Sequence, residues 1–155
     1  MKVVLDMLDQ AKVSYQVHEH PEVATIEEAR ALVPHLTIDL LKTVVFEVKD
    51  TERLLLVAVP CLAQVDYKSV AQIAGCSRRA LRLVNGERIE SELGFQVGGV
   101  RPFAIREGCE VVLDGGIDSN QLVKVGGGPR TLTIELAFSD LQNLSAATVA
   151  RVSKQ

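Results

Sequence analysis

The sequence contains no tryptophan, and aromatic residues account for only 4% of its 155 positions. Hydrophobic residues make up 47% of the chain and are mostly Val, Leu, Ile and Ala, so we predict an aliphatic core. Single domains typically contain about 100–150 residues. Because no Pro-, Gly- or Ser-rich linker divides the chain, we predict one compact domain that spans residues 1–155.

Long hydrophobic runs are also missing. Asp6 and Asp9 interrupt the N-terminal segment, which therefore resembles neither a secretory signal nor a membrane anchor. No stretch approaches the roughly 20 apolar residues that a membrane-spanning helix needs. We therefore expect a cytoplasmic protein without a membrane partner.

Cysteine and metal-binding patterns are sparse. Cys61, Cys76 and Cys109 are odd in number and form no CxxC pair, so we expect reduced thiols rather than a disulfide framework. His18 and His20 share one face of an extended chain, but no cysteine lies nearby to complete a metal site. We expect no metal there: the two histidines are either structural or surface residues, or they line a ligand cleft.

Several cofactor and catalytic motifs are absent from the sequence. It contains no P-loop, no GxGxxG after a strand, no HExxH and no GxSxG. We therefore expect no cofactor. With 17 basic and 20 acidic residues the formal net charge is -3, which disfavours a large nucleic-acid-coating surface. A small contact with the end of a nucleic acid remains possible.

Hydrophobic periodicity and turn signals predict short helices mixed with strands. Thr25 and Glu28 form a capping box, Gly75 ends a helix, and Asn85 and Ser139 begin helices. The expected helices are 2–12, 25–32, 66–74, 85–94 and 139–144, with a turn or short helix at 37–39. The expected strands are 14–18, 44–48, 54–59, 80–84, 110–113, 121–125 and 131–137. Hairpins dominate this order, which favours an α+β (mixed α/β) fold with a mixed, partly barrel-like sheet surrounded by helices.

Lys42 and the segment Gly98–Pro102 are the most informative pair in the chain. Lys42 stands where a strand is expected to begin, so it can project a cation from a rigid frame. The glycines and the proline form a loop with little side-chain bulk, whose backbone amides can approach a ligand. This combination suits an anionic, ester-bearing substrate. The alternatives are a lysine that reaches solvent and a tight turn without function.

Two further clusters have a structural and a functional interpretation. The segment Gly126–Gly128 lacks the lysine and hydroxyl of a P-loop, so it is either a flexible turn or part of a ligand cleft. Arg78, Arg79 and Arg82 form the main basic cluster. They either make a solvated patch or contact a phosphate backbone.

Five segments in this order resemble the YbaK/prolyl-tRNA synthetase-associated domain family, the aminoacyl-tRNA deacylases that edit mischarged tRNA. No single segment is specific, but together they cover nearly the whole chain. The segments are His20-Pro21 with Thr25; Lys42–Phe46; Val65–Ser69; Gly94 with Gly98–Phe103; and Gly127-Gly128 with Leu132–Leu136 and Asp140-Leu141.

The resemblance implies a cleft for the 3′-terminal adenosine of tRNA and its esterified amino acid. Lys42 would contact the phosphate or ribose, and the backbone of the Gly98–Pro102 loop would face the aminoacyl carbonyl and amino group. Lys42, Gly98 and Pro102 would then be catalytic. The implied substrate-binding residues are His18, His20, Thr25, Thr43, Gly99, Val100, Arg101, Gly126 and Gly127.

The implied reaction needs no catalytic triad, because an aminoacyl ester is already activated. Backbone amides would stabilise the oxyanion, and a ribose hydroxyl of the substrate would help to activate water. The implied partners are the tRNA acceptor end and an aminoacyl-tRNA synthetase. The expected reaction is trans-editing of proline tRNA that carries Ala, Cys or Ser.

Three positions depart from the family pattern of cysteinyl-tRNA deacylases. His18 stands in place of Tyr, Gly126 in place of a polar residue such as Ser, and Thr133 in place of Asp. These departures weaken the case for cysteine as the substrate. They also leave open a non-catalytic module that binds aminoacyl-tRNA or a synthetase, and an unrelated α+β domain in which Lys42 and the loop are structural.

Overall fold

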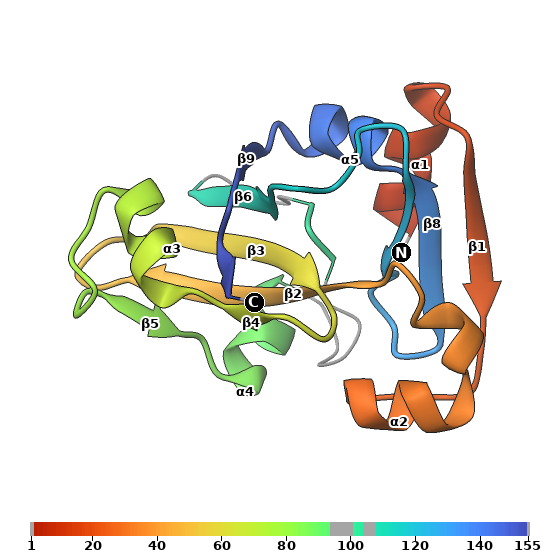
Figure 1. Ribbon diagram of the computed structural model, residues 1–155, viewed down its shortest axis with the longest axis horizontal. Coiled ribbons are helices and arrows are strands. Elements are labelled where there is room, and N and C mark those ends of the chain that lie inside the picture. The colour runs from red at the N-terminus through yellow and green to blue at the C-terminus, as the bar shows by residue number, and fades with distance from the viewer. Residues whose placement is uncertain (1, 94–100, 104–107, 155) are drawn as a thin grey trace.

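The computed structural model describes residues 2–93, 101–103 and 108–154 (Figure 1). Its helices are α1 (Lys2–Gln10), α2 (Ile26–Leu32), α3 (Tyr67–Ala74), α4 (Gly86–Arg88) and α5 (Phe138–Ser145), with a 3-10 turn η1 (Pro34–Leu36) and a π-helical turn η2 (Ile89–Leu93). Its strands are β1 (Tyr15–Glu19), β2 (Leu41–Val48), β3 (Leu54–Pro60), β4 (Gln64–Val65), β5 (Leu81–Leu83), β6 (Cys109–Asp114), β7 (Leu122–Gly126), β8 (Leu132–Ala137), β9 (Thr148–Ala150) and β10 (Ser153–Lys154).

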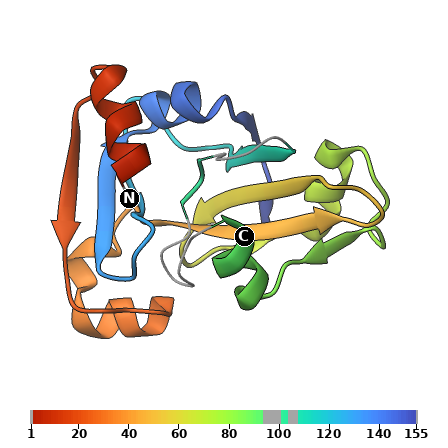
Figure 2. The same ribbon diagram turned by 180° about the vertical axis from the view of Figure 1, so that it is seen from behind.

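The described strands form three sheets. The largest has the order β5-β2-β3-β6-β9, antiparallel from β5 to β3 and parallel from β3 to β9. A three-stranded antiparallel sheet has the order β1-β8-β7, and its strands run across the direction of β2 and β3 (Figures 1 and 2). The third sheet pairs β4 with β10. The α+β class and the mixed sheet are confirmed, and the described strands form no closed barrel.

Strand β3 lies at the centre of two hydrophobic clusters. All its residues from Leu54 to Val59 are buried, as its nearly continuous apolar sequence predicts. Side chains alternate along a strand. Leu54, Leu56 and Ala58 therefore join one cluster, and Leu55, Val57 and Val59 join the other, under α3.

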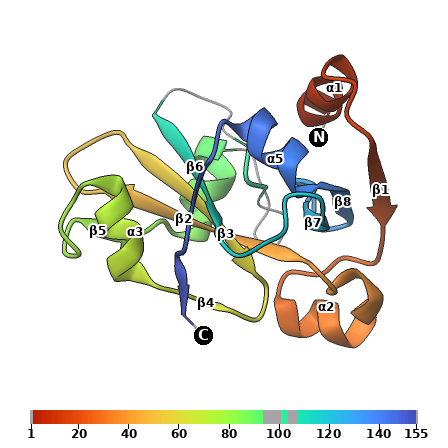
Figure 3. The ribbon, with the colours of Figure 1, turned by 45° about the horizontal axis from the view of Figure 1, so that its top comes forward.

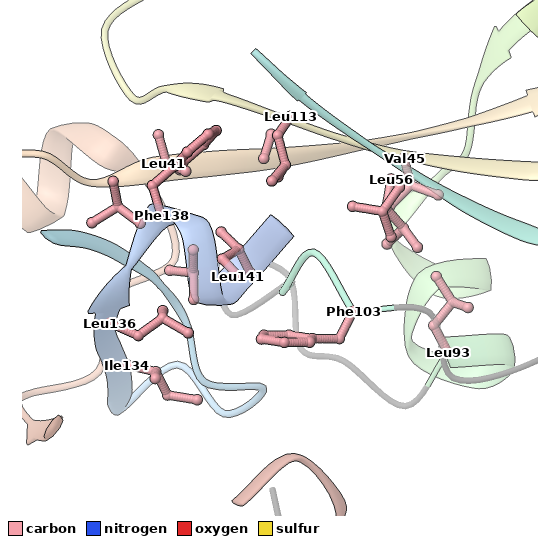
Figure 4. Packing of buried hydrophobic residues seen from close by; sticks show 14 of the residues in the cluster. Leu41, Val45, Leu56, Leu93, Phe103, Leu113, Ile134, Leu136, Phe138 and Leu141 are labelled. Carbon is pink, nitrogen blue, oxygen red and sulfur yellow. The ribbon is translucent and has the colours of Figure 1, made fainter. Parts of the chain in front are cut away.

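The first cluster fills the space between the two larger sheets. In Figure 4, Leu41, Val45 and Leu56 come from the five-stranded sheet and Ile134 and Leu136 from β8. Leu40 and Lys124 form a parallel bridge, which joins the segment before β2 to β7. This packing fixes the start of β2 against the three-stranded sheet.

Most predicted helix ends are confirmed. The Thr25 hydroxyl accepts from the Glu28 amide, Asp66 caps α3, Gly75 adopts the left-handed conformation, and Asn85 caps α4. The Ser139 cap is wrong. Helix α5 begins at Phe138 after Ala137, and the Ser139 amide instead donates to the Ser119 carbonyl, so tertiary contact determines this helix end.

Some short elements differ from the expected pattern. The turn expected at 37–39 is preceded by the 3-10 turn η1, in which Pro34 takes an early position that needs no N–H. Strands β4, β9 and β10 contain two or three residues each and were not predicted. All three cysteines are free, as expected. No helix within the described ranges is long and apolar enough to cross a membrane.

Candidate active site

A cavity of about 290 Å³ lies where α2 and η1 meet the ends of β1, β7 and β8 and the start of β2. Figure 2 shows α2 beside the end of β1 and the beginning of β8. One wall is apolar, because Val23, Ala29, Val33 and Leu36 form a separate buried cluster. The remaining wall is polar, and its lining includes His20, Thr25, Lys42, Thr43, Gly126 and Thr133.

Lys42 is the second residue of β2 and is half-buried at the edge of the cavity. Its pairing with Val59 of β3 fixes its backbone, so the cation projects from a rigid frame as predicted. The Cys61 thiol lies close enough to interact with the Lys42 charge. Burial raises the pKa of the Cys61 thiol, and the positive charge of Lys42 offsets part of this effect. The thiol therefore stays protonated near neutral pH.

Thr43, the next residue of β2, also lines the cavity. Its Oγ1 atom is inaccessible to solvent and has no hydrogen-bond partner among the described residues. Buried polar groups in folded proteins are almost always hydrogen-bonded, and an exception calls for an explanation. Because solvent in the cavity does not reach this atom, the hydroxyl is a buried polar group of β2 rather than an exposed part of the cavity wall.

His20 and Thr133 form a hydrogen-bonded pair on the cavity wall. The two residues are 113 positions apart, and His20 Nε2 lies 2.9 Å from Thr133 Oγ1. His20 Nδ1 lies 2.8 Å from the Pro21 carbonyl oxygen, which can only accept. In the neutral ring Nδ1 therefore carries the proton and Nε2 accepts from the Thr133 hydroxyl. The Thr133 oxygen then keeps lone pairs that can accept a hydrogen bond.

His18 is held in a different pair. Its Nε2 lies 2.8 Å from Glu135 Oε1 on β8, and both side chains are largely shielded from solvent. His18 is not among the residues that line the cavity. The parts of the chain that the structure describes contain no cluster of three or more His, Cys, Asp or Glu residues that could hold a metal ion.

Arg101, Pro102 and Phe103 are all buried. The Arg101 guanidinium donates from Nη1 to the Gly127 carbonyl oxygen at 3.3 Å, and burial lowers its pKa. Phe103 is only 1% exposed and belongs to the first hydrophobic cluster. Segment 101–103 is therefore attached both to the core and to the turn that follows β7.

The turn at Gly127 and Gly128 has no room for side chains. A Cβ atom on Gly127 would lie 2.8 Å from Leu132 Cβ and 3.0 Å from the Leu132 carbonyl oxygen. Gly128 has a φ of +104°, and a Cβ there would lie 3.1 Å from Arg101 Nη1. These close approaches make the glycine turn a tightly packed connection between segment 101–103 and the cavity wall at Gly126.

We expect Gly127→Ala to lower the free energy of unfolding by about 2–3 kcal/mol, because the added methyl group meets backbone atoms that cannot move away cheaply. Gly116→Ala is the control. Gly116 has a φ of +88° but no neighbouring atom within 4 Å of an added Cβ, so only backbone strain of about 1 kcal/mol is expected. Urea unfolding measures both variants. Equal losses would contradict the steric argument.

The cavity brings together five of the predicted site residues: His20, Thr25, Lys42, Thr43 and Gly126. Gly127, Arg101 and Pro102 are not among its lining residues, and Gly98, Gly99 and Val100 lie outside the described residues. The expected approach of the Gly98–Pro102 loop to Lys42 therefore stays a prediction.

Sequence reasoning missed the apolar wall of the cavity. The spacing of Ala29 and Val33, four residues apart, was the available signal, because such residues share one face of a helix. It also missed the bond between His20 and Thr133. Thr133 attracted attention only as a departure from a family pattern, and no local signal indicates its partner.

Comparison with known proteins places the chain among tRNA-editing proteins. A family model described as the aminoacyl-tRNA editing domain matches residues 20–144. The chain is 24% identical to the prolyl-tRNA editing protein ProX of Acetoanaerobium sticklandii over 150 residues, which cover 94% of this chain and 90% of ProX. It is 29% identical to the uncharacterized protein YwhH of Bacillus subtilis over 126 residues, which cover 81% of this chain and 78% of YwhH.

Solved structures support the same fold. The hypothetical protein APE2540 superimposes with a TM-score of 0.84 at 24% identity, and the match covers 97% of this chain and 99% of that one. A candidate trans-editing enzyme for prolyl-tRNA synthetase superimposes with a TM-score of 0.79 at 22% identity, covering 99% of this chain and 96% of that one.

Proposed function

Because the chain belongs to the aminoacyl-tRNA editing domain family, we propose that it hydrolyses the ester bond of mischarged aminoacyl-tRNA. The observation that carries this proposal is the cavity itself. It combines a cation, Lys42, with a hydrogen-bonded polar pair, His20 and Thr133, and a small apolar wall. These are the groups that a terminal nucleotide with a small esterified amino acid requires.

Proline tRNA that carries alanine, cysteine or serine is the proposed substrate. The name of the relative ProX refers to prolyl-tRNA editing. A cavity of about 290 Å³ is at the lower end of the range for small-molecule sites, and part of that space must hold the ribose. A small amino acid fits these limits better than a large one. The acceptor end of tRNA is the main partner, and a synthetase that supplies the mischarged tRNA is the second.

In the proposed mechanism the side chains of the cavity bind and orient the substrate. The Lys42 ammonium holds the terminal phosphate or ribose, and Thr43, the next residue of β2, lines the cavity beside it. Thr133, whose proton is directed to His20, accepts from the α-ammonium group of the amino acid. Each contact places the ester carbonyl at a fixed position.

Water then attacks the ester carbonyl, and the free hydroxyl of the terminal ribose helps to take its proton. Backbone amides of the Gly98–Pro102 loop are proposed to stabilise the oxyanion, where one such donor is typically worth about 3–4 kcal/mol. The ester C–O bond breaks, and the ribose oxygen leaves with a proton. The products are the free amino acid and intact tRNA.

Deacylation of a panel of tRNAs tests this proposal. Proline tRNA charged with alanine, cysteine, serine or proline is incubated with the protein, and the remaining ester is measured over time. We expect rapid loss of at least one small, incorrect amino acid and much slower loss of proline. Failure to accelerate hydrolysis of any panel member would overturn the reaction class.

A binding module without turnover is the second candidate, and one observation favours it. Among the described residues that line the cavity there is no carboxylate, and both ring nitrogens of His20 are already hydrogen-bonded. The described lining of the cavity thus offers no evident general base. Tight binding of a non-hydrolysable aminoacyl-adenosine analogue without turnover of the corresponding ester would support this candidate.

A further inference from the structure

A second hollow, which we call the basic groove, lies next to the cavity and has a volume of about 750 Å³. Its lining comes from the start of β2, from β4 and the beginning of α3, and from the C-terminal β10. Figure 3 shows β10 beside β4 and close to α3. The lining residues are Lys42, Val44, Gln64, Val65, Asp66, Tyr67, Lys68, Arg78 and Lys154.

The charge of the basic groove is opposite to that of the chain. Four cations, Lys42, Lys68, Arg78 and Lys154, line it together with one carboxylate, Asp66, whereas the whole chain has a net charge of -3. The Asp66 carboxylate caps α3, where it accepts from the Lys68 amide and the Ser69 hydroxyl, and its charge offsets only one of the four cations. The groove therefore presents excess positive charge to a ligand.

The cations of the basic groove come from fixed positions. The Arg78 guanidinium lies 4.5 Å from the centre of the Tyr67 ring, and that ring packs edge-on against the buried Phe46. Pairing of Lys154 with Gln64 brings the C-terminal strand to the rim. Stacking on an aromatic ring orients a guanidinium in advance, which reduces the entropy lost when it binds an anion.

Lys42 connects the two hollows, since it lines both the cavity and the basic groove. A strand that ends in the cavity would therefore leave it past Lys42 and enter the groove. We propose that the basic groove binds the phosphodiester backbone of the tRNA acceptor strand next to its 3′ end. This inference rests on the proposed function and assigns Arg78, part of the basic cluster of the sequence, to phosphate recognition.

A charge-removal experiment tests the basic groove. The variant Lys68→Gln/Arg78→Gln removes two cations that lie outside the cavity. The control Lys12→Asn/Lys49→Gln removes two exposed cations elsewhere. Lys12 comes shortly after α1, a helix that lies at the other end of the molecule from α3 (Figure 1), and Lys49 follows the opposite end of β2 from Lys42. Asn suits the left-handed backbone of Lys12. Urea unfolding confirms that both variants fold.

Two substrates distinguish the contribution of the basic groove to kcat/KM from that of the cavity. For mischarged proline tRNA, we expect the groove variant to lower kcat/KM about tenfold relative to wild type and to the control. For aminoacyl-adenosine, which keeps the ester and the terminal nucleoside but has no phosphodiester backbone, we expect equal kcat/KM for all three proteins. Loss of activity on both substrates, or on neither, would overturn the assignment.

Binding of an uncharged acceptor-stem RNA hairpin tests the basic groove independently of catalysis. The logarithm of the binding constant falls with the logarithm of the salt concentration by about 0.7–0.9 per phosphate contact. We therefore expect the groove variant to lose about 1.5 from the magnitude of this slope, and the control to lose nothing. Equal slopes for the groove variant and wild type would overturn the assignment of the groove to phosphate binding. A lower slope for the groove variant, in a protein that deacylates no tRNA, would overturn the proposed reaction and leave the phosphate-binding groove supported.

Discussion

Lys42→Ala is expected to lower kcat/KM for mischarged tRNA by about a hundredfold or more while leaving the protein folded. The half-buried ammonium lines both the cavity and the basic groove, so its removal takes away the charge at the point where the terminal nucleotide must lie. Truncation of one partner of a buried charge pair typically costs about 2–5 kcal/mol in binding, and each 1.4 kcal/mol is about a factor of ten. Deacylation under single-turnover conditions gives the rate.

A change in protein stability should not explain the lower kcat/KM of Lys42→Ala. Lys42 makes no ion pair with any described residue, and the stem of its side chain contributes only modest packing at the cavity edge. We therefore expect the free energy of unfolding to change by less than about 1 kcal/mol. A large loss of stability would indicate a structural lysine and contradict the proposed role.

Lys124→Gln is the matched control for Lys42→Ala. Lys124 lies on the neighbouring strand β7, and its ammonium donates to the Ile38 carbonyl rather than facing the cavity. Gln keeps a donor for that carbonyl and removes the charge. We expect this control to retain the wild-type deacylation rate, and equal losses in the two variants would show a general charge effect.

The kinetic pattern of Lys42→Ala also distinguishes two roles. A rise in KM with unchanged kcat would indicate that the ammonium binds ground state and transition state equally. An equal fall in kcat and kcat/KM would indicate a contact made chiefly in the transition state. The position of Lys42 at the connection between the two hollows favours a mainly binding role, with the larger change in KM.

Local sequence signals predicted the frame of the site well. Lys42 was expected at a strand start and lies at the second position of β2. The Thr25 cap begins α2, which supplies one wall of the cavity. Such features depend on a few neighbouring residues, whose hydrogen bonds and hydrophobic spacing can be read directly from the chain.

The parts of the site that depend on contacts between residues distant in the sequence could not be predicted. The bond between His20 and Thr133 requires β1 to pair with β8, and the basic groove requires the C-terminal β10 to pair with β4. Strands of two or three residues carry almost no periodic signal of their own. Arg101 was expected to bind substrate. Its buried guanidinium contacts the glycine turn, a long-range contact that no local signal indicates, and its expected role stays a prediction.

Phe103→Ala is expected to lower the free energy of unfolding by about 3–5 kcal/mol, because it removes a fully buried aromatic side chain. Figure 4 shows the ring reaching from segment 101–103 toward Ile134 and Leu136 of β8. This contact, together with the bond from Arg101 to Gly127, fixes residues 101–103, which include the last two residues of the proposed oxyanion loop. Urea unfolding measures the loss.

Activity should also fall in Phe103→Ala, beyond what its lower stability explains. The matched control is Phe138→Ala. Phe138 is 2% exposed in the same cluster, but it belongs to α5, whereas Phe103 directly follows the last residue of the proposed loop. At a temperature where both variants remain folded by circular dichroism, we expect only Phe103→Ala to lower kcat for deacylation, by about tenfold or more. A misplacement of about 1 Å can cost a factor of 100 in rate. Equal kcat values for the two variants would show that Phe103 stabilises the core without positioning the loop.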